Sequence, residues 1–259
     1  MEQAKQGGNE TAPEMAGYYR GAGCFSLKAA ELNELLGVGR CFDMTGRDLS
    51  IGGRQARLWV VNGYAQEDLL ERVIAGWQAL PDLNSVTDAA DFCRRYVSAC
   101  DAAAEPDRDT AVMGVFAGKT LAIIDGFGGG VVLDAKQFPT RSVEEPDTSR
   151  VLRGSHDGFV ENLMQNAALL RRRVRDTHLR LERLQLPERS GTDVALCYME
   201  GEADEGLLRA LREKLMHIQL RSVAMSQETI AEAIAPRQFW NPLGYSKLST
   251  QKYPPPKQA

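Results

Sequence analysis

The sequence predicts a mixed α/β fold built from two small α/β subdomains, and three observations lead to this prediction. Short apolar runs of strand length alternate with amphipathic stretches of helix length. Tight glycine turns separate neighbouring apolar runs in the first half, which predicts an antiparallel meander. In the second half an apolar run, an amphipathic stretch and another apolar run follow in order, which predicts a βαβ unit.

Composition places the boundaries of these subdomains. Residues 1–25 are polar and glycine-rich, which predicts a flexible tail. Residues 140–150 are charged and contain proline, so we expect a connector there. This divides the chain into a first subdomain at 26–139 and a second at 151–242, followed by a proline-rich tail at 243–259.

Capping residues and periodicity place the elements of the first subdomain. Ser26 can cap a first helix, and Gly37 can end it. Residues 103–110 are polar and contain proline, which predicts a loop. We expect helices at about 26–36, 66–80 and 86–96, and strands at 41–44, 49–51, 56–61, 111–116, 120–124 and 131–134.

The second subdomain is predicted to begin with a helix over 159–174, capped by Asp157 or Ser155. This helix has one apolar stripe, made of Phe159, Leu163, Ala167, Leu170 and Val174. The expected elements after it are a strand at 193–199, a helix at 205–216, a strand at 218–223 and a helix from Ser226 to about 235.

Charge and cysteine usage narrow the functional classes. The formal net charge of −4 does not favour binding of the whole chain to nucleic acid or an anionic membrane. The 5 cysteines are odd in number and lack a CxxC spacing, which fits a reducing compartment rather than a disulfide framework. The chain as given has no apolar stretch of the roughly 18–20 residues that span a bilayer, and the polar, glycine-rich residues 1–24 are not expected to act as a signal peptide.

No pattern in the sequence predicts catalysis or a cofactor. The three histidines, His156, His178 and His217, have no metal-ligand spacing, and no GxSxG nucleophile motif occurs. Gly118-Lys119-Thr120 resembles the end of a phosphate-binding loop, but the glycine spacing favours a hairpin turn. The glycines of 126–130 lie between two expected strands, so a hairpin loop is favoured over a dinucleotide site. We therefore predict a non-enzymatic protein without cofactor or metal.

An arginine cluster is the most distinctive feature, and it consists of Arg171, Arg172, Arg173, Arg175, Arg180 and Arg183. It is compatible with a phosphate-binding patch, an anionic-lipid contact, ion pairing at an interface, or a solvated helix face. Consecutive helical residues point about 100° apart, so one or two of these arginines must face protein. Nearby candidate partners are Glu161, Asp176 and Glu182. The absence of interleaved aromatics argues against single-stranded nucleic acid.

Residues 137–176 carry a longer pattern. It contains Phe138-Pro139, Glu144-Glu145-Pro146, Arg153-Gly154, Asp157-Gly158-Phe159, Glu161, Asn166, Leu169, Arg171, Arg172, Arg173 and Asp176. This pattern, continued by Ser-Gly-Thr-Asp at 190–193, resembles the GerA-type spore germination proteins over about residues 30–242. Residues 36–64 are similar to the stage V sporulation protein AF branch of that family.

The resemblance implies the cytoplasmic N-terminal region of a protein of the spore inner membrane, which forms oligomers with itself and with other germination proteins during ion release. It also leaves room for a small-molecule ligand between the subdomains, and no nucleic acid is expected. The residues expected at an assembly or subdomain interface are Arg153, Asp157, Phe159, Glu161, Asn166, Arg171, Arg172, Arg173 and Asp176. The alternatives are a stand-alone soluble regulator that binds membrane-bound germination proteins and a phosphate- or nucleic-acid-binding module.

The resemblance also implies that family members continue beyond residue 242 with more strands and transmembrane helices. On this basis the second subdomain of the chain as given is expected to be incomplete, through truncation or a frameshift.

Overall fold

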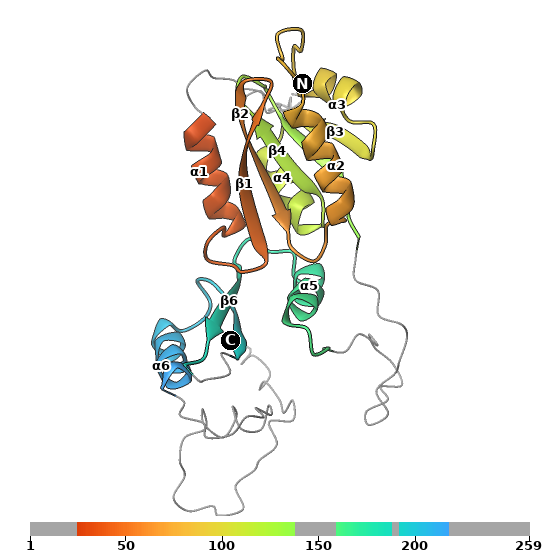
Figure 1. The fold of residues 1–259 in the computed structure, drawn as a ribbon. Coiled ribbons are helices and arrows are strands. Elements are labelled where there is room, and N and C mark those ends of the chain that lie inside the picture. The colour runs from red at the N-terminus through yellow and green to blue at the C-terminus, as the bar shows by residue number, and fades with distance from the viewer. Residues whose placement is uncertain (1–24, 138–158, 188–191, 218–259) are drawn as a thin grey trace, which may run out of the picture. The chain divides into compact units, whose positions relative to one another are not determined.

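The computed structural model describes residues 25–137, 159–187 and 192–217, and its helices and strands confirm the mixed α/β class (Figure 1). The elements are α1 (Phe25–Leu36), β1 (Met44–Ile51), β2 (Arg54–Val61), α2 (Glu67–Gln78), α3 (Ala89–Tyr96), β3 (Asp101–Glu105), α4 (Arg108–Phe116), β4 (Thr120–Ile124), β5 (Gly130–Asp134), α5 (Leu163–Arg173), β6 (Leu179–Gln185), β7 (Asp193–Met199) and α6 (Glu205–Met216).

A five-stranded antiparallel sheet with the order β1-β2-β4-β5-β3 forms the centre of the first part of the chain. The predicted hairpin across 126–130 is confirmed, because β4 and β5 are antiparallel neighbours. A two-residue turn joins β1 to β2, with Gly52 at φ 52° and Gly53 at φ 77°. Two consecutive positive φ angles are typical of the type I′ hairpin turn, which favours glycine at both positions.

Helices cover both faces of this sheet, and the alternation of side chains along each strand explains why. In β4, Ala122 and Ile124 face a core that contains Trp77 of α2 and Phe92 of α3. Leu121 and Ile123 point the other way, into a core shared with α1 and with Phe116 of α4. Successive side chains of a strand point to opposite faces, so a sheet buried on both faces lies between two layers of helices.

The segment 101–116 corrects the predicted meander. Residues 103–105, expected to begin a loop, belong to edge strand β3, and 111–116 lie in helix α4 rather than in a strand. Asp107 caps this helix, because its side chain accepts hydrogen bonds from the backbone N–H and the hydroxyl of Thr110. The turn at Gly118 therefore follows a helix and is not the predicted hairpin.

Three other elements differ from the prediction. Instead of two short strands at 41–44 and 49–51 there is one strand, β1, which begins at Met44, and residues 41–43 lie before it in a bridge and a turn. The helix expected over 159–174 begins only at Leu163, and Phe159 is exposed rather than part of a buried stripe. Strand β6 was not predicted, and it pairs with β7 as an antiparallel two-stranded sheet.

By its internal contacts the chain divides into one unit of residues 1–185 and 193–204 and another of residues 186–192 and 205–259. Several predicted features lie outside the described residues. They are the connector at 140–150, the strand at 218–223, the helix from Ser226, the tails up to residue 24 and from residue 243, and the caps Asp157 and Ser155. The βαβ unit and the domain boundaries therefore remain predictions. Within the described ranges no helix is both long enough and apolar enough to cross a membrane.

Candidate functional site

Helix α5 carries the central part of the predicted site, and two asparagines define its start. The Asn162 side chain accepts hydrogen bonds from the backbone N–H groups of Met164 (2.9 Å) and Gln165 (3.2 Å), as an N-cap does. The Asn166 side chain accepts from the backbone N–H of Val160 (2.7 Å) and donates to its carbonyl (2.6 Å). Asn166, one of the predicted site residues, thus fixes the backbone just before the helix.

Arg171 is the arginine of the cluster that turns inward. Its side chain is 1% exposed and meets the fully buried carboxylate of Asp43 through two parallel bonds. Nε donates to Oδ2 at 2.9 Å and Nη2 donates to Oδ1 at 3.0 Å, while Nη1 donates to the Leu179 carbonyl at 3.1 Å. The guanidinium also lies 5.1 Å from the ring centroid of Phe116. This planar, bidentate geometry suits arginine and would not be reproduced by lysine.

The electrostatics of this pair follow from its burial. Burial alone would lower the pKa of Arg171, but hydrogen bonding and the charge of Asp43 more than offset it, so the pKa is raised. The Arg171 guanidinium is therefore charged in the folded chain. Because an isolated charge is costly inside a protein, each residue depends on the other for its burial.

Helix α5 connects two apolar clusters of the first unit. Ala168 packs in the cluster that contains Phe116 and Trp59, whereas Ala167 packs with Leu179 and Leu181 of β6. The buried Tyr64 hydroxyl donates to the Ala168 carbonyl at 2.7 Å, and burial raises the pKa of this tyrosine. The helix is therefore fixed from both sides by packing as well as by the ion pair.

A second charged network joins the end of α1 to strands β6 and β7. The Arg180 side chain, 6% exposed, donates to Oε2 of Glu200 through Nε (2.8 Å) and Nη2. Arg40 donates to the other oxygen, Oε1, at 2.9 Å and to the Glu34 carbonyl at 3.1 Å. One carboxylate therefore bridges two arginines, one of which also holds the carboxyl end of α1.

Acidification is expected to weaken this network. Hydrogen bonds from Arg180 hold the pKa of Glu200 below its ordinary value of 4.5. A carboxyl whose pKa is lower in the folded state stabilises the fold above the unfolded pKa, and this contribution is lost as pH falls through the folded pKa. We expect Glu200→Gln to be less stable than the parent chain near neutral pH, with the gap closing below about pH 4. Urea unfolding between about pH 7 and pH 3 measures this, and a gap that stays constant would contradict it.

Among the residues that the structure describes, none of the other predicted site residues is hydrogen-bonded to the Arg171 side chain. Arg172, Arg173, Glu161 and Phe159 are exposed. The Asp176 carboxylate accepts from the backbone N–H of His178 (2.7 Å) and lies 2.8 Å from its Nδ1, and these hydrogen bonds lower the pKa of Asp176. Arg153 and Asp157 lie outside the described residues.

The partner of Arg171 was missed by sequence reasoning. It is Asp43 rather than any of the expected carboxylates Glu161, Asp176 and Glu182, and it lies 128 positions away along the chain. The only local signal is a carboxylate within the apolar stretch 41–44, at a place where a buried charge requires a partner. In the part of the chain that the structure describes, no group of three or more histidine, cysteine, aspartate or glutamate side chains could hold a metal ion.

Comparison with known proteins identifies the family. The model of the family described as Bacillus/Clostridium GerA spore germination protein matches residues 30–250. The chain belongs to the GerA family. Among GerA relatives, stage V sporulation protein AF of Bacillus subtilis (strain 168) is 32% identical over 208 residues, which are 80% of this chain and 42% of that protein. Spore germination protein XA of Bacillus anthracis is 35% identical over 125 residues, 48% of this chain and 25% of that protein.

A solved structure of a germinant receptor subunit supports the fold. It is the N-terminal domain of the A subunit of the Bacillus megaterium spore germinant receptor GerK3, with a TM-score of 0.60 and 18% sequence identity. The match covers 83% of this chain and 80% of that one, so the two share a fold over most of their length. The chain spans less than half the length of the two curated relatives named above.

Proposed function

We propose that this GerA-family chain is the cytoplasmic N-terminal region of a spore germination protein similar to stage V sporulation protein AF. It acts in oligomer assembly and signal coupling for ion release during germination, at the cytoplasmic face of the spore inner membrane. Its family membership and its fold, shared with the N-terminal domain of a germinant receptor subunit, support this proposal. The role is one of binding, without turnover.

The main observation behind the proposal is that the three consecutive arginines at the end of α5 face different surroundings. Arg171 points inward and holds the helix through Asp43, whereas Arg172 and Arg173 are exposed at the end of the same helix. A helix fixed in this way presents its outer arginines, Arg172 and Arg173, in a defined orientation. This reduces the conformational entropy that is lost on binding. Exposed arginines are well suited to pair with carboxylates and carbonyls of another protein.

The partners of this surface are another copy of the chain and other spore germination proteins of the inner membrane. If the outer arginines form the contact, the fold should tolerate their loss while the assembly should not. Arginines are enriched among the residues that contribute most to protein interfaces.

We expect Arg172→Ala combined with Arg173→Ala to weaken co-purification of the tagged chain with germination proteins from spore membranes about tenfold or more. The matched control is Arg72→Ala, which removes an exposed arginine from α2, far along the sequence from α5. Germination kinetics of the same strains give the functional measurement. Full assembly and unchanged germination in the double variant would refute the assembly role of α5.

A further inference from the structure

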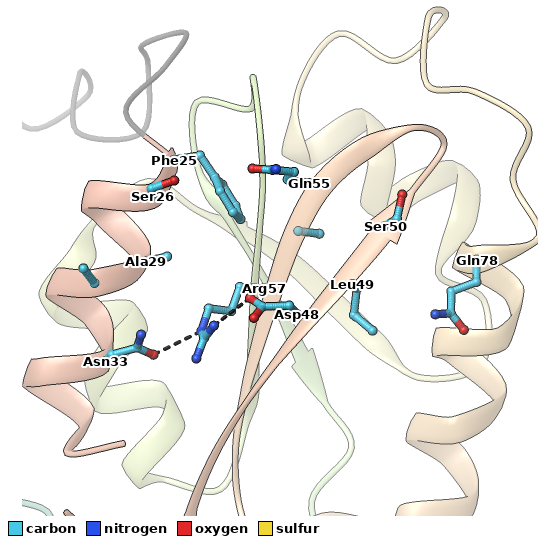
Figure 2. A pocket seen from close by; sticks show the side chains of 12 residues that line it. Phe25, Ser26, Ala29, Asn33, Asp48, Leu49, Ser50, Gln55, Arg57 and Gln78 are labelled. Atoms are coloured by element: carbon cyan, nitrogen blue, oxygen red, sulfur yellow. Dashed lines mark hydrogen bonds and ion pairs between the residues drawn. The ribbon is translucent and has the colours of Figure 1, made fainter. Parts of the chain in front are cut away.

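An open groove with a volume of about 550 Å³ follows the free edge of the five-stranded sheet. Figure 2 shows Phe25, Ser26, Ala29 and Asn33 of α1 on one side of β1 and Gln78, the last residue of α2, on the other. Asp48, Leu49 and Ser50 of β1 lie between these two sides. The groove is therefore bounded by both helical layers, with the sheet edge as its floor.

The backbone of β1 offers unused hydrogen-bonding groups to this groove. The two-residue turn makes Ile51 and Arg54 a hydrogen-bonded pair. The backbone N–H and C=O groups of the odd-numbered residues of β1 therefore bond to β2, and those of the even-numbered residues point away from β2. The bond from the Asn62 N–H to the Asp43 carbonyl agrees with this alternation. In the described part of the chain, the backbone groups of Gly46, Asp48 and Ser50 have no hydrogen-bond partner.

Hydrogen bonds fix the side chains next to this edge in position. Arg57 donates to the Asp48 carboxylate through Nη1 (2.6 Å) and to the Asn33 Oδ1 through Nε (3.1 Å). The Asp48 side chain is nevertheless 76% exposed, whereas the Arg57 side chain is 17% exposed. Ala29 and Ala30 of α1 are small, which leaves space beside the strand. The accessible charge on this face of the edge is therefore a fixed carboxylate.

We propose that β1 is a docking edge for an extended segment of a different polypeptide, which adds to the sheet as an antiparallel strand. Charge complementarity defines this segment, because Arg47 and Asp48 are exposed and alternate between the two faces of the strand. The segment carries a basic residue opposite Asp48 and, directly after it, an acidic residue opposite Arg47. Main-chain hydrogen bonds supply affinity, and the two charge pairs supply register. This proposal is independent of the assembly contact on α5.

A second copy of the chain does not fit this edge. The two antiparallel registers that pair most of β1 with β1 of another copy have a two-fold axis at Asp48 or at Arg47. The first places two aspartates opposite each other, and the second places two arginines opposite each other. Like charges directly opposite are destabilising, and charged side chains are a common protection of sheet edges against self-pairing.

Fluorescence anisotropy of the full chain with labelled synthetic peptides tests the proposal. The probe is an eight-residue threonine–valine peptide with Lys-Glu at its centre, and the matched probe has Glu-Lys in the same place. We expect the Lys-Glu probe to bind about fivefold to tenfold more tightly, because each cross-strand charge pair changes from attractive to repulsive in the other probe. Asp48→Asn should reduce this preference.

Blocking the edge separates strand addition from binding of charge alone. Ser50→Pro removes an N–H that points away from β2 and should lower the affinity for the Lys-Glu probe at least tenfold, whereas Ser50→Thr keeps that N–H and should not. A probe N-methylated on the amides that face β1 gives the same test on the unaltered chain. Equal affinities for the two probes, binding that survives N-methylation, or dimerisation of the chain through β1 would overturn the proposal.

Discussion

Replacing Arg171 with alanine is expected to lower the free energy of unfolding by about 3–5 kcal/mol. The variant leaves the Asp43 carboxylate, which is fully buried, without its bidentate partner. It also removes the bond to the Leu179 carbonyl and the contact with Phe116. Urea unfolding at neutral pH measures the loss, and Asp43→Ala should give a loss of similar size.

The neighbouring arginine supplies the matched control. Arg172 is exposed, so Arg172→Ala should change the free energy of unfolding by no more than about 1 kcal/mol, the usual upper limit for an exposed ion pair. Arg171→Met combined with Asp43→Leu should recover most of the stability, because an apolar pair avoids the unpaired charge that either single variant leaves. A loss below about 1 kcal/mol for Arg171→Ala would contradict the role given to this pair.

The second large effect concerns the turn between β1 and β2. Gly52 has φ 52°, and a Cβ placed there would lie 2.7 Å from the Asp82 carbonyl carbon and 2.9 Å from the Leu83 backbone nitrogen. Backbone atoms cannot rotate away as a side chain can. Gly52→Ala should therefore cost about 2–5 kcal/mol, the sum of left-handed backbone strain and overpacking.

The adjacent glycine separates these two contributions. Gly53 has φ 77°, but a Cβ there would have nothing within 4 Å. Gly53→Ala should therefore show the conformational cost alone, about 1–2 kcal/mol. Thermal or urea unfolding of the two variants gives both values. Equal losses would mean that the clash with the 82–83 backbone carries no cost.

Much of the sheet could be predicted because its signals are local. The helices near 26–36 and 66–80 follow from apolar periodicity, although Ser26 lies within α1 rather than before it, and the β4–β5 hairpin follows from its glycines. The run 111–116 misled the prediction, because its length and its valines fit a strand as well as a helix. Two features favour the helix. Asp107 acts as its N-cap, and one side of the helix is buried through Ala111, Val112, Val115 and Phe116.

The site was only partly predictable, for a different reason. That one arginine of 171–173 must face protein follows from helical geometry alone. Which carboxylate it meets depends on a contact between residues 128 positions apart, and no spacing within either segment encodes that contact. The Glu200 bridge between Arg40 and Arg180 was missed for the same reason, since Arg40 lies in the turn after α1 and Arg180 lies on β6.

Sedimentation velocity of the full chain most directly tests the claim that α5 is anchored by Arg171 and assembles through its outer arginines. We predict that the parent chain sediments as an oligomer and that Arg172→Ala combined with Arg173→Ala shifts it to the monomer. The double variant should keep the parent free energy of unfolding within about 1 kcal/mol. A double variant that sediments like the parent chain, or a parent chain that is monomeric at every concentration, would contradict the claim.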